Sequence, residues 1–386
     1  MRTPDGKMPP ILKGSVIKKY RTLKGMRQER LAELVGLDVR SIGAYEREER
    51  PLTNIQTAKR IVTVLGIPPS ESGLADTPST FLNNTDDVIN EIWRLITIAE
   101  FLEAQRGVIT LQEYLQHQPH NQTSDKQRSY ANFLSGYIES IVCHTNDMKQ
   151  PLVYFERMES YAHNDHDLLS LSLTSQGNMM LAMGKIDNAI EVMEKSLNLT
   201  HLASDALKGN NYQLLGRAYF KKNKINLFEQ AMSRSKNLAE RVMNEKAKTS
   251  SLEMIHVPYS LFTVYEEYIR SFAQRNNIAK CMDYLNRAQD VLPHEERWEM
   301  LLMVTRGEVF IRKALRRIML NHNESIQKND DFLYGIHLVG KATEMSKKKG
   351  HNKLVRRTRK IHTYLSRNSL KFGEAAEMLR EVVYGI

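Results

Sequence analysis

The chain has 386 residues, enough for more than one domain, and it is basic, with a formal net charge of +10. Its two cysteines, Cys143 and Cys281, are too few for a disulfide framework and suit a reducing compartment. The first residues lack the apolar segment of a secretory signal, and no run of about 18 apolar residues occurs anywhere. We therefore expect a cytoplasmic protein with no membrane partner.

Residues 1–11 are expected to form a loose arm. From Met26 to Arg50 the pattern predicts two short amphipathic helices joined by a tight turn. Gly36 ends the first helix, because glycine adopts a left-handed conformation without steric cost, and Asp38 is a suitable N-cap for the second. The apolar face of the first helix consists of Leu31, Ala32, Leu34 and Val35. In the second helix Ile42 and Tyr45 point inward, and the solvent side carries Arg40, Ser41, Ala44 and Arg47.

A short helix with small and basic side chains on its exposed face suits the major groove of DNA. The stretch closely resembles the XRE (lambda/434 repressor-like) helix-turn-helix family over about residues 12–68, on the positions Gln28, Leu31-Ala32, Gly36, Ile42 and Tyr45-Glu46-Arg47. Residues 17–21 look like the family's first helix, and residues 58–65 look like its fourth. The resemblance implies a lambda-repressor-like domain that binds double-stranded DNA.

That resemblance also implies which side chains contact DNA: Arg27, Gln28, Val39, Arg40, Ser41, Ala44 and Arg47. Four of them, Val39, Arg40, Ser41 and Ala44, occupy positions that face bases, and Arg40 is the strongest candidate for guanine. Arg27 and Arg47 would bind phosphates, while Gln28 would contact a phosphate and support the base-reading helix. A protein-binding module is the alternative use of such a domain.

Prolines and small polar residues predict a linker over residues 67–85, between a DNA-binding domain at 1–66 and a second domain at 86–386. Basic residues are concentrated at the two ends of the chain. They outnumber acidic residues two to one in residues 1–66 and three to one in residues 341–386. The amino-terminal excess fits local contact with phosphates, and the carboxy-terminal run is expected to be a solvated face.

From Asp86 onward the pattern is helical, so the whole chain is predicted to be all-α. Gly136, Gly177 and Gly216 recur about every 40 residues, each in a helix followed by a second helix. These units resemble degenerate tetratricopeptide repeats (TPR), although the leading Trp and closing Pro of that pattern are missing. Such an array is an α-solenoid of TPR-like helix pairs with a concave inner face.

The resemblance places two rows of residues on that concave face, one directly after each glycine and one three residues before it. Extending the rows to a fourth unit through Cys281 gives the predicted peptide-binding set: Tyr137, Thr174, Asn178, Gln213, Arg217, Glu266 and Arg270. Asparagine offers both a donor and an acceptor to a peptide backbone, and arginine can hold a carboxylate. The alternative is that these are ordinary solvated residues.

Residues 308–386 admit two interpretations. They continue the repeats, or they form a terminal bundle that caps the array and mediates dimerisation. The second interpretation is suggested by an apolar stripe at Phe372, Ala376, Leu379 and Val383.

No catalytic motif is present, and we expect no enzyme activity, no cofactor and no metal. Residues 335–341, GIHLVGK, match a phosphate-binding loop up to its lysine, but Ala342 stands where the magnesium-binding hydroxyl belongs and no strand precedes it. Residues 163–167, HNDHD, contain metal-ligand types, but a polar loop with an N-cap is the better interpretation.

The combination of an XRE-type reader and a degenerate tetratricopeptide array resembles the RRNPP group, the peptide-responsive quorum-sensing regulators of Gram-positive bacteria and their phages. The resemblance implies a homodimeric transcription regulator whose body binds a short signalling peptide that alters DNA binding. One alternative is a protein-interaction scaffold, in which the array binds a partner protein and the reader only tethers it. Another is an enzyme-associated regulator similar to the phosphatase-like relatives.

Overall fold

The computed structural model describes residues 12–52, 55–67, 85–145, 147–163, 165–199, 204–246, 258–320, 325–367 and 369–385. The chain divides into two compact units, Met1–Thr85 and Asp86–Ile386. The expected arm and nearly all of the expected linker lie outside the described residues. Within those ranges every regular element is helical apart from an isolated β-bridge between Leu12 and Leu52. The all-α prediction is therefore confirmed.

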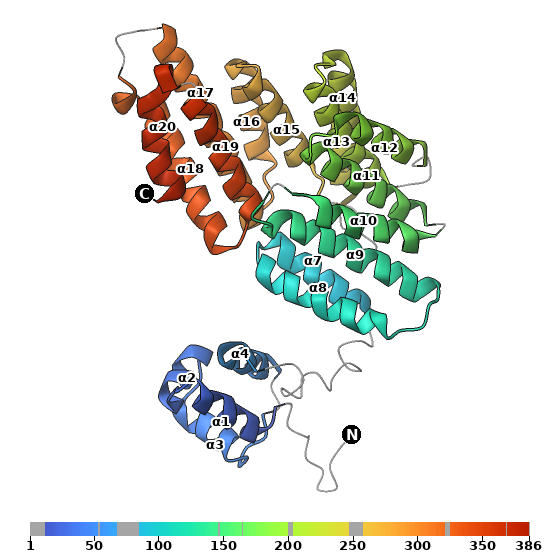
Figure 1. Ribbon diagram of the computed structural model, residues 1–386, viewed down its shortest axis with the longest axis vertical. Coiled ribbons are helices and arrows are strands. Elements are labelled where there is room, and N and C mark those ends of the chain that lie inside the picture. Colours follow the sequence, from blue (N-terminus) through green and yellow to red (C-terminus); the bar gives the residue numbers. More distant parts are fainter. Residues whose placement is uncertain are drawn as a thin grey trace. The chain divides into compact units, whose positions relative to one another are not determined.

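The amino-terminal unit contains four helices (Figure 1): α1 (Gly14–Leu23), α2 (Gln28–Val35), α3 (Val39–Glu46) and α4 (Ile55–Leu65). Each contributes a fully buried aliphatic residue to one small core: Ile17, Leu31, Ile42 and Ile61. The turn between α2 and α3 follows the sequence prediction. Gly36 has φ 66°, and the Asp38 carboxylate accepts a hydrogen bond from the Ser41 amide at 2.8 Å.

Leu34 is a correction to the predicted face of α2. Its side chain is 44% exposed, whereas Leu31, Ala32 and Val35 are buried. At 100° per residue Leu34 lies at the edge of the arc that these three define, on the side away from Ala32. The buried face of α2 is therefore narrower than the apolar pattern suggested.

The second unit, here called the body, is an array of helices that pack in consecutive pairs (Figure 1). In chain order its first four pairs are α7 (Thr85–Thr97) with α8 (Phe101–Gln116), α9 (Gln122–Val142) with α10 (Lys149–Ala162), α11 (His166–Ala182) with α12 (Ile186–Leu199), and α13 (Asp205–Lys221) with α14 (Ile225–Lys246). The rest are α15 (Leu261–Gln274) with α16 (Ile278–Asp290), α17 (Glu296–Leu320) with α18 (Asp330–Lys348), and α19 (Asn352–Arg367) with α20 (Ser369–Tyr384), the short 3₁₀ turn η2 (Ile326–Lys328) preceding α18.

The three repeated glycines occupy equivalent places in successive pairs. A Cβ at any of them would lie 2.7–2.9 Å from a side chain of the paired helix, which is Phe155 for Gly136, Met193 for Gly177 and Met232 for Gly216. The fourth unit has no glycine at this place, but Ile269 stands there and its carbonyl contacts the Cys281 sulfur at 3.5 Å. The glycines therefore allow the two helices of a pair to approach closely, and the frame used to align the units is consistent with the packing.

The turns inside these pairs repeat as well. Gly184, Asn223 and Asn276 each follow the first helix of a pair and each has a positive φ, at 83°, 57° and 58°. Glycine and asparagine tolerate this left-handed conformation best, so the turn is encoded by residue type. The body is a regular helix-pair array; its assignment to the tetratricopeptide class remains a prediction.

The carboxy-terminal pair caps the array. The apolar stripe of α20 is buried in the chain's own core, with Phe372, Ala376, Leu379 and Val383 all less than 10% exposed. The expectation that this stripe forms a dimer contact is therefore wrong for these residues, because their surface is already covered within one chain. Capping is the role that the packing shows.

The phosphate-loop-like segment 335–341 and the histidine- and aspartate-rich segment 163–167 both take part in helix packing or capping. Residues 335–341 are inside α18, where Gly335 packs against Gly307 of α17. In the 163–167 segment Asp165 caps α11, and His163 Nε2 lies 3.1 Å from the Asp125 carboxylate. In the described ranges no helix has the length and apolarity that crossing a membrane requires.

Candidate functional site

Helix α3 presents the predicted base-reading face to solvent. Arg40 and Arg47 are exposed, Val39 is 37% exposed, and Ser41 and Ala44 are half-buried. Ile42 and Tyr45 are buried on the opposite side, as the sequence predicts. Arg27, just before α2, is exposed as well. The amphipathic pattern of the sequence therefore predicted the orientation of this helix.

A buried carboxylate fixes α3 against its neighbours. The Glu46 side chain is 2% exposed and accepts hydrogen bonds from Arg21 Nε at 2.5 Å and Arg21 Nη2 at 2.8 Å. Gln28 of α2 donates a third hydrogen bond at 2.7 Å. Burial acts to raise the pKa of Glu46, but the bonds from Arg21 and Gln28 outweigh it and lower the pKa. Gln28 therefore holds α2 against the reader helix, which is the supporting role expected of it.

Two of the predicted contact residues already have partners at the surface. Ser41 Oγ donates to Asp38 at 2.6 Å, so its hydroxyl retains only acceptor capacity. Arg47 forms two hydrogen bonds with Glu49, at 2.7 and 2.9 Å, in a fully exposed pair. Such a pair contributes little to stability, so Arg47 is available to a competing anion.

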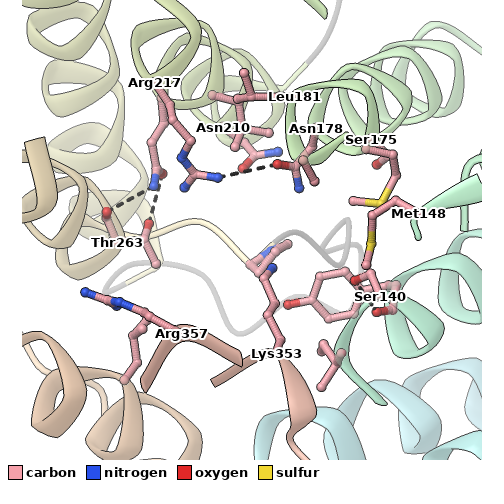
Figure 2. A pocket seen from close by; sticks show the side chains of 18 of the residues that line it. Ser140, Met148, Ser175, Asn178, Leu181, Asn210, Arg217, Thr263, Lys353 and Arg357 are labelled. Carbon is pink, nitrogen blue, oxygen red and sulfur yellow. Dashed lines mark hydrogen bonds between the residues drawn. The ribbon is translucent and has the colours of Figure 1, made fainter. Parts of the chain in front are cut away.

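The body contains a cavity of about 340 Å³, partly open to solvent, between the first helices of its pairs and α19 (Figure 2). Its walls combine apolar surface, including Phe133, Leu171 and Trp298, with amides and many basic side chains. Asn178 and Arg217 lie on one side, and Lys353 extends from α19 into the open space opposite them (Figure 2). The volume lies at the lower end of the range for small-ligand sites.

Six of the seven residues predicted to form the concave face line this cavity: Tyr137, Asn178, Gln213, Arg217, Glu266 and Arg270. Thr174 is the exception and a correction. It is 1% exposed, and its hydroxyl lies 3.1 Å from that of Ser196 on the paired helix α12. Residues three positions before the glycine lie next to the second helix of their pair. A short side chain there, such as Thr174, is covered by that helix, whereas the longer Gln213 and Glu266 extend to the cavity.

Several cavity residues are already joined by ion pairs. Arg217 binds Glu267 with two nitrogens, at 2.8 and 2.5 Å, and Arg357 binds Glu266 at 2.7 Å. Glu308 lies 3.4 Å from Arg357 and 3.1 Å from Arg312. Burial acts to raise the pKa of Glu308, but Arg357, Arg312 and Arg270 outweigh it, so the pKa is lowered and the carboxylate stays charged.

Sequence reasoning missed the contribution of α19. Lys353, Arg356, Arg357 and Lys360 all line the cavity, at the i, i+3, i+4, i+7 spacing of one helical face. The expectation that the carboxy-terminal basic run is a solvated face is therefore wrong for Arg356 and Arg357, which are half-buried, whereas Lys353 and Lys360 line the cavity and remain exposed. The spacing was visible in the sequence, but nothing local indicated that the face turns inward.

α19 reaches this position because it is bonded to the end of α9. Arg356 donates to the carbonyl oxygens of Ser140, at 3.1 Å, and Cys143. Asn352 donates to the carbonyl of Val142 at 2.5 Å. These carbonyls lie in the last turn of α9 and at its C-cap, Cys143, where no later helical amide reaches them and positive charge is favoured. Helix pairs far apart in the sequence are thereby joined around the cavity.

Comparison with known proteins gives a family match and a similar solved structure. Residues 17–72 match the family model described as helix-turn-helix, HTH_3. None of the curated proteins matches the sequence. The crystal structure of Bacillus thuringiensis PlcR in complex with the peptide PapR7 and DNA aligns with 80% of this chain and 98% of that chain, at a TM-score of 0.42 and 12% identity. A likeness this distant does not establish a shared function.

The family match covers α2 and α3 together with the residues predicted to face DNA. The chain thus carries an XRE-type helix-turn-helix DNA-binding domain at its amino end, followed by an all-helical body.

Proposed function

We propose that this chain is a sequence-specific transcription regulator, active as a homodimer, whose body binds a short signalling peptide that alters its binding to DNA. Residues 1–66 are the DNA-binding domain, 67–85 the linker and 86–386 the ligand-binding and dimerisation domain. The observation that carries the proposal is the pairing, in one chain, of an exposed reader helix with a cavity lined by the predicted concave face.

In the DNA complex, Arg40 donates to guanine from the exposed side of α3. Ser41 accepts a hydrogen bond from an amino group of adenine or cytosine, because its own proton is held by Asp38. Val39 and Ala44 contact bases through apolar surface. Arg27, Gln28 and Arg47 contact phosphates, Arg47 by exchanging Glu49 for the anion.

The cavity favours a small ligand over a partner protein. It is bounded by α19 as well as by the array, and its volume has room for part of a short peptide but not for a folded surface. Asn178 and Asn210 line it, and among the described residues the Asn178 carbonyl oxygen has one distant donor, Arg217 Nη1 at 3.4 Å. Amides in this position can bind the peptide backbone with both donor and acceptor.

A ligand in the body controls DNA binding through the dimer. Two readers must meet half-sites about one helical turn, roughly 34 Å, apart. A peptide that binds one curvature of the array better than another shifts the population of dimers with the correct spacing, by an amount limited by its differential affinity.

The DNA half of the proposal is tested by selecting duplexes from a random library with the full chain and measuring affinity for the enriched sequence. We expect Arg40→Ala to weaken binding by about 1–3 kcal/mol and to relax specificity at one base pair. Arg47→Ala should weaken binding to all DNA sequences alike. It should also reduce the slope of log affinity against log salt concentration by about 1, the loss of one released counterion.

Arg94→Ala, which removes an exposed arginine paired with Glu91 in the body, is the control and should bind DNA as the parent does. If Arg40→Ala and Arg47→Ala also bind as the parent does at low salt, α3 is not the reader.

The scaffold alternative is supported if the purified chain retains a stoichiometric protein and no peptide.

A further inference from the structure

The wall of the cavity carries far more positive than negative charge. Its described residues include four basic side chains from α19, and four more come from α13, α15 and α17: Arg217, Lys221, Arg270 and Arg297. Glu266 is the sole carboxylate among the described lining residues, and two others, Glu267 and Glu308, pair with arginines of the wall. Three carboxylates therefore face eight cations.

The glutamates neutralise only part of this cluster. Arg217 is bound to Glu267, Arg357 to Glu266 and Glu308, and Arg270 lies 3.8 Å from both Glu266 and Glu267. Lys221 donates to the carbonyl of Leu181 at 3.2 Å, which satisfies a hydrogen bond but not its charge. The remaining cations have no carboxylate partner within the described part of the body.

Arg297 and Lys353 are the clearest of these unneutralised groups. Arg297 is 6% exposed, donates from Nη2 to Tyr137 and stacks over Trp298, while its Nη1 is buried without a hydrogen-bond partner. Lys353 is exposed, and its side chain extends into the cavity (Figure 2). Desolvation inside the cavity, with the charges of Arg217, Arg297, Arg270 and Arg356, lowers the pKa of Lys353 to about 7.

Cations that crowd one cavity without carboxylate partners repel one another, and an anion bound among them offsets that repulsion. The rest of the wall selects what carries the anion. Phe133, Leu171, Met179 and Trp298 provide apolar surface, and Asn178 and Asn210 provide amides. A chain with apolar side chains, peptide groups and a carboxylate matches all three kinds of surface, whereas a small inorganic anion matches only one.

We propose that the ligand of this cavity is an acidic peptide, one of whose carboxylates binds Lys353 among the unneutralised cations of the wall. This inference rests on the proposed function and specifies its ligand. The carboxylate is the carboxyl end of the peptide or an Asp or Glu side chain; both present the same two oxygens to the ammonium group.

The test uses the full chain and three pools of synthetic heptapeptides that share the same apolar positions. The first pool has Asp and Glu at the polar positions and a free carboxyl end. The second has Asn and Gln with an amidated end, and the third has Lys and Arg with an amidated end. Peptides that co-elute with the protein are identified by mass spectrometry, and the best is titrated. A fourth arm carries inorganic phosphate and citrate.

We expect the acidic pool to be retained at least about tenfold more strongly than the neutral pool. Lys353→Met should weaken the best acidic peptide by about tenfold, and Lys360→Met, also on the cavity face of α19, is a second variant should the first not fold. Arg359→Gln is the matched control, since Arg359 is exposed and lies over Tyr384, away from the cavity.

Equal retention of the acidic and neutral pools, or preference for the basic pool, would overturn this inference while leaving peptide binding intact. Retention of no peptide would contradict the proposed function itself, and binding of phosphate or citrate alone would show that the cavity takes a small anion. An acidic peptide that binds Lys353→Met and the parent equally would also overturn the assignment of its carboxylate.

Discussion

Glu46 is the buried carboxylate on which the position of the reader helix depends. Replacing it with alanine leaves the Arg21 guanidinium, 14% exposed, without its ion pair and removes the support from Gln28. We expect a loss of about 2–4 kcal/mol in the stability of the amino-terminal unit, measured as faster amide exchange throughout α1–α3 in the full chain.

Glu33→Ala is the control for that measurement. Glu33 forms an exposed pair with Arg30 at 2.6 Å, so its loss should change stability by less than about 0.5 kcal/mol. If the two variants exchange at the same rate, the Glu46 cluster does not hold the unit together.

Lys353 should make the free protein less stable at neutral pH than at alkaline pH. Its pKa is lowered to about 7 in the folded state from an ordinary value of 10.5, so between these values the unfolded chain binds more protons than the folded one. Stability attributable to this residue therefore increases as the pH rises from about 7 to about 10. Other ionisable groups around the same cavity are Tyr137, Arg217, Lys221, Glu266, Arg270, Arg297, His351, Arg356, Arg357 and Lys360.

Because these neighbours remain in both proteins, the difference between the parent and Lys353→Met isolates Lys353. We expect the variant to melt at a higher temperature than the parent at pH 7, and the gap to close toward pH 10. A variant that melts lower at pH 7 would show that Lys353 has a partner that stabilises its charge.

The helix pairs depend on close approach at the repeated glycines. A Cβ at Gly177 would lie 2.7 Å from Met193 Cγ and 3.2 Å from the Ala189 carbonyl oxygen, so Gly177→Ala forces the two helices apart. We expect a loss of about 1–3 kcal/mol in the unfolding free energy of the body. Gly373→Ala, in α20, meets nothing within 4 Å and should raise stability by up to about 1 kcal/mol, because alanine is the better helix former.

Chemical denaturation of the two variants separates these effects. A Gly177→Ala protein as stable as the parent would mean that the helix pairs repack freely, and that the glycine spacing does not encode the array.

At the scale of elements, the sequence predicts what local pattern determines. The 3.6-residue period predicts the reader helix, and residue types that tolerate a left-handed backbone, such as Gly36 and Gly184, mark the ends of helices. The recurring glycines also predict the units well enough to place six cavity residues.

What local pattern does not determine is which surface another element covers. Leu34 and Thr174 were misassigned because exposure depends on neighbouring helices and not on spacing alone. The basic face of α19 belongs to the cavity only because Arg356 and Asn352 bind the end of α9, more than about 200 residues earlier in the chain. Contacts of this separation leave no trace in the local sequence.

For the whole molecule, the proposed control by a ligand would act through α19, which closes the array. A peptide carboxylate that binds Lys353 contacts the helix whose Arg356 holds the end of α9, so ligand binding and the curvature of the body involve the same element. Coupling between the peptide site and the DNA site requires an element that can adopt two arrangements. Each ligand must favour one of those arrangements over the other.

The most direct test of this account is the affinity of the full-length protein for its selected operator, measured with and without the acidic heptapeptide that the cavity retains best. We predict a change of about 5–150-fold, in either direction, and the same factor in the affinity for the peptide when operator is present, because coupling between binding sites is reciprocal. Lys353→Met should lose that change at the peptide concentration that saturates the parent. An operator affinity that is unchanged when the cavity is fully occupied would contradict the claim that the body controls the reader.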